Sequence, residues 1–97
     1  MRKLVSVSEN NWPSVLVYSM HDCADCSRSK ALLMRLGVSY EEIYVEDDPA
    51  ATAEVIRLND GRRILPTIII GGATVLAEPA DRELEAALRD KRGLAAI

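Results

Sequence analysis

The chain has 97 residues, enough for one domain with one hydrophobic core. Hydrophobic residues make up 48% and charged residues 28%, a balance typical of a folded globular protein rather than a disordered one. Twelve basic against fifteen acidic residues give a net charge of −3, so we expect no nucleic-acid partner. We find no signal-peptide pattern and no apolar run of membrane length, and we therefore expect a cytoplasmic protein with no membrane partner.

Strand and helix patterns alternate along the chain. The predicted elements are a strand at 15–18, a helix at 24–36, a strand at 40–45, a helix at 49–58, strands at 67–70 and 73–76, and a helix that begins at 79 and ends before Gly93. Local signals support these limits. Gly37 can end the first helix in a left-handed conformation, Asp48-Pro49 can cap and begin the second, and Gly71-Gly72 can turn a hairpin.

The order β-α-β-α-β-β-α predicts an α/β fold. A right-handed crossover makes the first two strands parallel, and the hairpin makes the last two antiparallel. We therefore predict one mixed four-stranded sheet flanked by three helices. The domain is expected to span 14–92, with an N-terminal extension at 1–13 that is not assigned to any element and a C-terminal tail at 93–97.

Cys23 and Cys26 are the only cysteines of the chain, and they lie where the first predicted strand gives way to the first helix. Backbone N–H groups without an intrahelical partner, together with the positive end of the helix dipole, favour a thiolate at this position. On a regular helix, residues three apart have Cα atoms roughly 5 Å apart, within the range that a disulfide allows. The pair can therefore cycle between dithiol and disulfide.

Several segments occur together in an order that resembles a known family. They are Val17-Tyr18-Ser19 ahead of the Cys-x-x-Cys motif, the segments 37–42 and 59–68, and Pro79 ahead of the last helix. In order and spacing they are similar to the glutaredoxins of the thioredoxin superfamily, and within these to the short mycoredoxins. The resemblance covers about residues 15–89 and implies the thioredoxin fold.

The resemblance implies a role for each cysteine. Cys23 would be the nucleophile that attacks a mixed disulfide between a protein and a low-molecular-weight thiol, and Cys26 would be the resolving residue. A second small thiol could release the adduct on Cys23, or Cys26 could displace it by closing a disulfide. Both routes begin with the same attack, so the sequence leaves them open.

The resemblance also implies a ligand-binding groove opposite Cys23. In similar proteins the bond corresponding to Leu65-Pro66 is cis, and the backbone of the residue before the proline pairs with an extended ligand. Arg63 would hold a ligand carboxylate through its guanidinium group. Thr67 would contribute to the groove through its backbone. For the neighbouring Arg62 we favour a solvent-exposed turn residue without a binding role.

Some positions depart from the family pattern. Asp22 and Asp25 stand where mycoredoxins carry aromatic residues, and two carboxylates beside Cys23 oppose its ionisation. Ser19 replaces the lysine of glutathione-using members, and Ala77-Glu78-Pro79-Ala80 replaces their Gly-Gly-Cys-Asp stretch. The co-substrate therefore remains open between mycothiol, bacillithiol and glutathione, with no permanently bound cofactor expected.

Other functions remain as alternatives. The chain could be a thioredoxin-like electron donor to a reductase, or Cys23 and Cys26 could hold a metal or a [2Fe-2S] cluster in a dimer. His21 could assist Cys23, although a loop histidine more often has no catalytic role. The main expectation is a monomer that reduces oxidised or S-thiolated proteins, with no metal bound.

Overall fold

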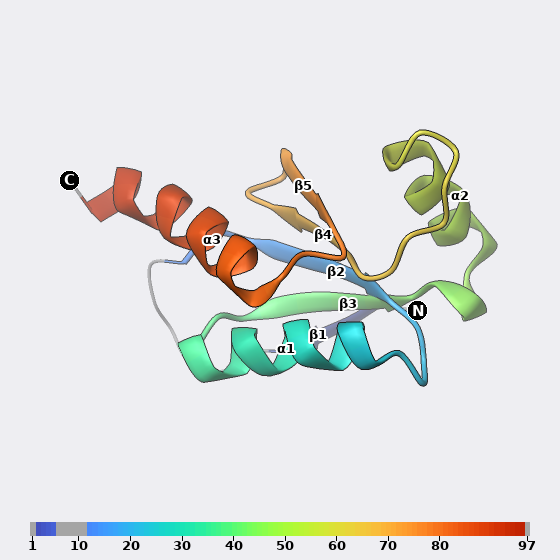
Figure 1. Cartoon of the computed structure of the whole chain (residues 1–97), viewed down its shortest axis with the longest axis horizontal. Helices are drawn as coiled ribbons and strands as arrows, with labels where there is room; N and C mark the ends of the chain where they lie inside the picture. The colour runs from blue at the N-terminus through green and yellow to red at the C-terminus, as the bar shows by residue number, and fades with distance from the viewer. Residues whose placement is uncertain (1, 6–11, 97) are drawn as a thin grey trace.

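The computed structural model of the chain, described for residues 2–5 and 12–96, contains one mixed five-stranded sheet with the strand order β1-β3-β2-β4-β5 (Figure 1). The strands are β1 (Arg2–Val5), β2 (Val15–Ser19), β3 (Tyr40–Tyr44), β4 (Thr67–Ile70) and β5 (Thr74–Ala77). The helices are α1 (Ala24–Leu36), α2 (Pro49–Leu58) and α3 (Asp81–Ala96), with a 3-10 turn at Val45–Asp47.

The predicted four-stranded mixed sheet is confirmed. β2 runs parallel to β3 and antiparallel to β4, and β4 pairs antiparallel with β5. The structure adds β1, which the sequence analysis did not assign: it pairs antiparallel with β3, with Arg2 opposite Ile43 and Val5 opposite Tyr40. Part of the expected extension is therefore a strand of the sheet, whereas residues 6–11 lie outside the described part of the chain.

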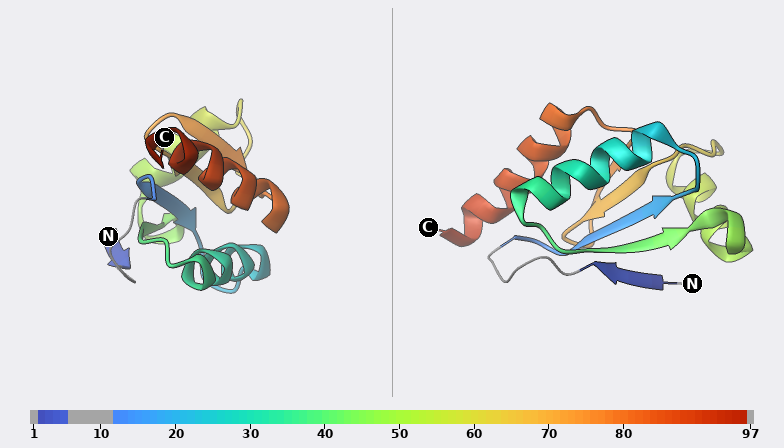
Figure 2. Two further views of the ribbon diagram at one scale, coloured as in Figure 1. Left: turned by 90° about the vertical axis from the view of Figure 1, so that its left-hand side faces the viewer. Right: turned by 90° about the horizontal axis from the view of Figure 1, so that it is seen from below.

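The sheet has a separate hydrophobic cluster on each face. Alternate residues of a strand point to opposite faces, so Tyr40 packs in one cluster and Ile43 in the other. The first cluster joins α1 and α3 to the sheet, and the second joins α2 to it. Figure 2 shows α1 lying across the sheet with α3 beside it. Leu33 and Leu88 are completely buried in the first cluster, and burial of such a side chain contributes roughly 1.5–3 kcal/mol.

The predicted helix limits are confirmed for α1 and α2. Gly37 ends α1 with φ 73°, and its N–H is directed at the carbonyls of Leu33 and Met34. Asp48 caps α2, since its carboxylate accepts a hydrogen bond from the N–H of Ala51 at 3.0 Å. Gly71 and Gly72 both have positive φ in the hairpin turn, as the sequence suggested. These local signals fix where the chain turns back onto the sheet.

The predicted limits of the last helix are wrong at both ends. α3 begins at Asp81 rather than Pro79, because the carbonyl of Ala80 accepts the first helical hydrogen bond, from Leu84 N–H. It continues through Gly93 to Ala96, so most of the expected tail at 93–97 is helical. A glycine inside a helix costs only about 1 kcal/mol relative to alanine, which does not by itself end a helix. Among the described residues, no helix is both long and apolar enough to cross a membrane.

Candidate functional site

The two cysteines lie at the start of α1, as predicted, and form a disulfide with their Cα atoms 5.2 Å apart. Cys23 is the N-cap of α1, and its sulfur accepts a hydrogen bond from the N–H of Cys26 at 3.2 Å. The exposures of the two residues differ: Cys23 is partly exposed, whereas Cys26 is 1% exposed. An incoming molecule can therefore reach Cys23 but not Cys26.

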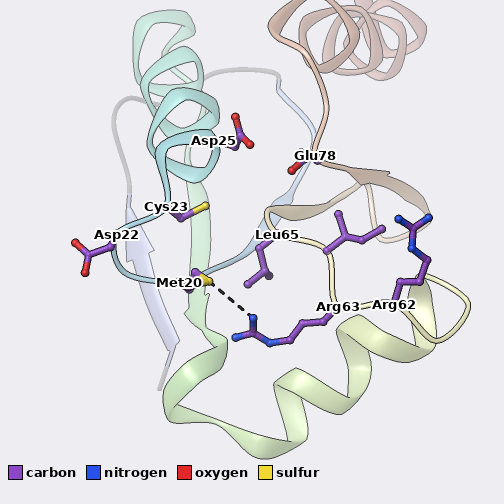
Figure 3. Close-up of a pocket in the computed structure, with 9 residues that line it drawn as sticks. Met20, Asp22, Cys23, Asp25, Arg62, Arg63, Leu65 and Glu78 are labelled. Carbon is purple, nitrogen blue, oxygen red and sulfur yellow. Dashed lines mark hydrogen bonds between the residues drawn. The ribbon is translucent and has the colours of Figure 1, made fainter.

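Cys23 faces an open pocket of about 430 Å³ (Figure 3). The pocket is lined by Met20, Asp22, Cys23, Asp25, Arg62, Arg63, Ile64, Leu65 and Glu78. Three parts of the chain supply these residues: the start of α1 with the preceding loop, the loop between α2 and β4, and the residue after β5. The sheet topology brings them together, because β2 and β4 are neighbours and α1 follows β2 directly.

The wall opposite Cys23 is the loop that precedes β4. The Leu65-Pro66 bond is cis, as the resemblance implied. Leu65 lines the pocket, whereas Pro66 and Thr67 are buried and are not among its lining residues. The hydroxyl of Thr67 donates to the carbonyl of Ile64 at 2.7 Å and accepts from the Asn59 amide at 3.0 Å. Thr67 therefore holds the loop in place with its side chain.

Both arginines of this loop reach the pocket. Arg63, the residue expected to hold a carboxylate, places Nη1 4.0 Å from the sulfur of Met20 (Figure 3). Arg62, for which we expected no binding role, also lines the pocket. Both side chains are exposed, and the described residues form no salt bridge with either. Two guanidinium groups are thus available to an anionic ligand beside Cys23.

His21 is not among the residues that line this pocket. Its ring stacks on Tyr44 with the centroids 4.2 Å apart, and its Nδ1 lies 3.1 Å from the carboxylate of Glu46. The backbone N–H of His21 also donates to Glu46 at 2.8 Å, and this bond lowers the pKa of the Glu46 carboxyl. The contacts of His21 are those of a residue that holds the loop after β2 against the end of β3.

A buried polar cluster lies between α1 and the sheet. Glu42 on β3 is 2% exposed, and its carboxylate accepts hydrogen bonds from Ser19 at 2.7 Å and from Lys30 at 2.6 Å. Burial acts to raise the pKa of Glu42, but the hydrogen bonds from Lys30 and Ser19 outweigh it, so the pKa lies below its ordinary value. Burial acts to lower the pKa of Lys30, and the bond to Glu42 outweighs that effect and raises it.

The same cluster accounts for Ser19, which stands where glutathione-using members of the family carry a lysine. The Ser19 side chain is completely buried and directed at Glu42, so this position does not reach the pocket. Lys30, one helical turn after Cys26, supplies the cation of the cluster from α1. The cluster therefore joins the cysteine-bearing helix to the parallel strands beneath it.

One pocket is lined by Cys23, Arg63 and Leu65, three of the predicted site residues, and also by Arg62 and Glu78, for which no ligand contact was predicted. Local sequence signals do not identify Glu78, because its place depends on how β4 and β5 pair, whereas Arg62 adjoins the predicted Arg63 in the loop before β4. Among the described residues, no group of three or more His, Cys, Asp or Glu side chains could hold a metal ion. What the geometry offers is a reachable sulfur at a helix start, a buried partner sulfur and a pocket with charges of both signs.

The chain is similar to several known proteins in sequence and in fold. Residues 15–75 match the family model described as Glutaredoxin. A glutaredoxin-type protein of Mycobacterium tuberculosis is 29% identical over 75 residues, which cover 77% of this chain and 89% of that protein. The solved glutaredoxin of Methanosarcina mazei has a TM-score of 0.68 and 26% identity, covering 95% of this chain and 87% of its own.

A further solved structure is the glutaredoxin-like NrdH-redoxin of Escherichia coli, whose activity profile is described as thioredoxin-like. It has a TM-score of 0.64 and 27% identity, over 75% of this chain and 92% of its own. The fold is the thioredoxin fold in each of these structures, and the Cys23-Cys26 pair is placed for thiol-disulfide chemistry. The chain belongs to the glutaredoxin family.

Proposed function

We propose that this protein reduces mixed disulfides between proteins and a low-molecular-weight thiol, with Cys23 as nucleophile and Cys26 as resolving residue. The observation that carries the proposal is the difference in access: the Cys23 sulfur faces an open pocket, and Cys26 is buried behind it. Attack by Cys23 and subsequent resolution by Cys26 follow from this difference. We further propose that the protein acts as a cytoplasmic monomer.

The first step is a thiol-disulfide exchange at Cys23. The Cys23 thiolate attacks the sulfur of the small thiol, a new disulfide forms between them, and the protein substrate leaves as a thiolate that takes up a proton. The free N–H groups at the start of α1 favour the attacking thiolate. Because Cys23 is the N-cap, its sulfur is already within reach of one such group, the N–H of Cys26.

The second step has two routes. Another molecule of the small thiol can attack the adduct and leave Cys23 as a thiolate. Alternatively, Cys26 can attack the Cys23 sulfur, which expels the small thiol and forms the Cys23–Cys26 disulfide. The Cα separation of 5.2 Å supports the second route, because it lies within the range of relaxed disulfides.

The pocket would hold the small thiol during both steps. Under this proposal Leu65 offers its backbone to an extended ligand, and Arg63 pairs with a ligand carboxylate. Pro66 and Thr67 are buried beside Leu65, and they support this wall from behind. Glutathione, mycothiol and bacillithiol each remain candidate co-substrates at this site.

The test compares two matched variants, Cys23→Ser and Cys26→Ser. Each reduced variant is mixed with a cysteine-containing peptide that carries glutathione, mycothiol or bacillithiol in disulfide linkage. We expect Cys26→Ser to accumulate a small-thiol adduct, seen by intact mass, with at least one of the three thiols. Cys23→Ser should show release of peptide no faster than the solution reaction. Equal activity of the two variants, or no adduct with any thiol, would overturn the proposal.

A thioredoxin-like electron donor is the second candidate function. The similarity to the NrdH-redoxin, whose activity profile is described as thioredoxin-like, favours it. A donor of this kind reduces protein disulfides directly and requires both cysteines. If Cys26→Ser abolishes reduction of a protein disulfide and forms no small-thiol adduct, this function is supported over the first.

A further inference from the structure

Two carboxylates of the pocket lie apart from its arginines, and a third, that of Asp22, is directed away from the Cys23 sulfur (Figure 3). In Figure 3, Asp25 and Glu78 lie on one side of the Cys23 sulfur, and Arg63 lies on the other. All of these residues line the same pocket, so a ligand joined to Cys23 would meet both sides at once. Asp25 and Glu78 are two of the positions at which the chain departs from its family.

The acidic side carries more negative than positive charge. Arg28 is 2.6 Å from the carboxylate of Asp25 and 3.6 Å from that of Asp81, and it also donates to the Pro79 carbonyl at 3.1 Å. Glu78 lies next to this group, and Asp25 and Glu78 both line the adjoining pocket with Arg28 and Asp81. Asp81 is also 3.8 Å from Arg35, so three carboxylates face two guanidinium groups and one net negative charge remains on this side.

The position of Glu78 is fixed by its backbone. Its N–H donates to the carbonyl of Pro66 at 2.7 Å, and its φ of 49° turns the chain between β5 and the approach to α3. The side chain itself is exposed, and the described residues form no salt bridge with it. Glu78 can therefore meet a cationic group of a ligand without first breaking an ion pair.

The opposite side offers the complementary charge. Arg62 and Arg63 are exposed and line the pocket beyond Leu65. A ligand with only negative groups would pair with the arginines but would place any second anion against Asp25 and Glu78. A ligand with a cation at one end and an anion at the other satisfies both sides.

We propose that the pocket selects small thiols that carry both a free ammonium group and a carboxylate, with the ammonium group near Asp25 and Glu78 and the carboxylate near Arg63. Glu78 is the specificity-determining residue for the ammonium group. This inference rests on the proposed function, because it concerns the thiol that becomes joined to Cys23.

The test uses four disulfide probes, each with 2-thiopyridine as the leaving group. The four thiols are cysteinylglycine, its N-acetyl form, its glycinamide form and the form with both changes, so that ammonium and carboxylate are removed singly and together. Cys23 attacks the cysteine sulfur of the probe, the disulfide to the pyridyl group breaks, and 2-thiopyridone departs with the electron pair and takes up a proton. The reaction is followed by absorbance on Cys26→Ser and on the same chain with Glu78→Gln.

The rate of each probe with the protein is divided by the rate of the same probe with 2-mercaptoethanol. This ratio removes intrinsic differences in reactivity between the probes. We expect the free ammonium group to accelerate the reaction of Cys26→Ser about threefold, as for an exposed ion pair. Glu78→Gln should reduce this factor at least by half. Asp90→Asn removes one exposed carboxylate of α3 far along the chain from the pocket residues, so it is the matched control and should retain the full factor.

The outcomes separate this inference from the function on which it rests. If Cys26→Ser forms no adduct with any probe, the proposed function fails, and the inference fails with it. If all four probes react in the same ratios as with 2-mercaptoethanol, Cys23 is a working nucleophile, but the pocket does not discriminate between thiols by their charged groups. Only the inference is then overturned. Equal loss of the ammonium factor in Glu78→Gln and Asp90→Asn would overturn the role of Glu78.

Discussion

The charged residues beneath α1 and those around its first turn are organised in opposite ways. Glu42 is buried, and Lys30 and Ser19 hydrogen-bond to its carboxylate. Beside Cys23, Glu78 and Arg63 are exposed and lie on opposite sides of the sulfur. Charges that already pair inside the protein stabilise the fold, whereas those that do not pair can be used by a ligand. The same helix therefore serves stability along its length and chemistry at its start.

Removal of the buried cation should have the largest effect on stability. Lys30→Met leaves the Glu42 carboxylate buried without its ionic partner, which costs about 3 kcal/mol in a fully buried pair. Lys30 is 21% exposed, so water can partly replace it, and we expect a loss of about 2 kcal/mol in the free energy of unfolding. The measurement is urea denaturation at neutral pH.

Two further variants decide whether this loss comes from the pair. Arg82→Met changes an exposed residue of α3 and should alter the free energy of unfolding by less than about 0.5 kcal/mol. The double variant Lys30→Met/Glu42→Leu should recover part of the stability, because it removes the isolated charge as well. A double variant that is less stable than the unmodified chain by the sum of the two single-variant effects would contradict the comparison.

The contribution of Glu42 should depend on pH. Because its pKa in the folded protein lies below the ordinary value of 4.5, the carboxylate stabilises the fold above that pH, and the contribution is lost as the pH falls through the folded value. At neutral pH we expect Glu42→Gln to be less stable than the unmodified chain by about 2 kcal/mol, the typical value of a hydrogen bond to a charged group. Denaturation from pH 7 to below 4.5 should show this difference shrinking, and a constant difference would argue against the assignment.

The separated charges of the pocket should respond to salt. Arg63→Gln should slow the reaction of Cys23 with a carboxylate-bearing mixed disulfide about threefold at low ionic strength, and Arg82→Gln should leave that rate unchanged. The Debye length falls from about 30 Å at 0.01 M to about 3 Å at 1 M salt, so the effect of Arg63→Gln should largely disappear at the higher concentration. An effect of Arg63→Gln that persists in full at 1 M salt would show that it is not electrostatic.

The smallest effect is expected at His21. It does not line the pocket, and its contacts are with Tyr44 and Glu46. His21→Ala should therefore leave the alkylation rate of Cys23 within about twofold of the unmodified rate between pH 5 and pH 9, the range in which histidine and reactive cysteine titrate. A selective loss of reactivity on one side of neutral pH would instead place His21 in the mechanism.

Most of the fold could be predicted from the sequence because its signals are local. Gly37, Asp48 and the pair Gly71-Gly72 each act within a few residues, and each turns the chain where expected. β1 was not predicted, because a four-residue strand at the edge of a sheet has no periodic pattern strong enough to identify it. The end of α3 was missed because a single glycine costs too little free energy to end a helix by itself.

The candidate site could be predicted only in part. Cys23 and Cys26 are adjacent on one helical turn, so the motif alone placed them. Glu78 reaches the pocket through the pairing of β4 with β5, and Glu42 meets Lys30 and Ser19 across 12 and 23 residues of chain. Contacts of this kind depend on strand register and on helix packing, which neither composition nor spacing contains.

The short strand β1 has a consequence for how the molecule behaves among its own copies. With β1 in place, β3 is an inner strand, and the two outermost strands, β1 and β5, have four residues each. Short outer strands offer few unpaired backbone groups to another sheet, which limits edge-to-edge aggregation. A chain shortened by its first five residues would uncover β3, and size-exclusion chromatography at increasing concentration would then reveal self-association.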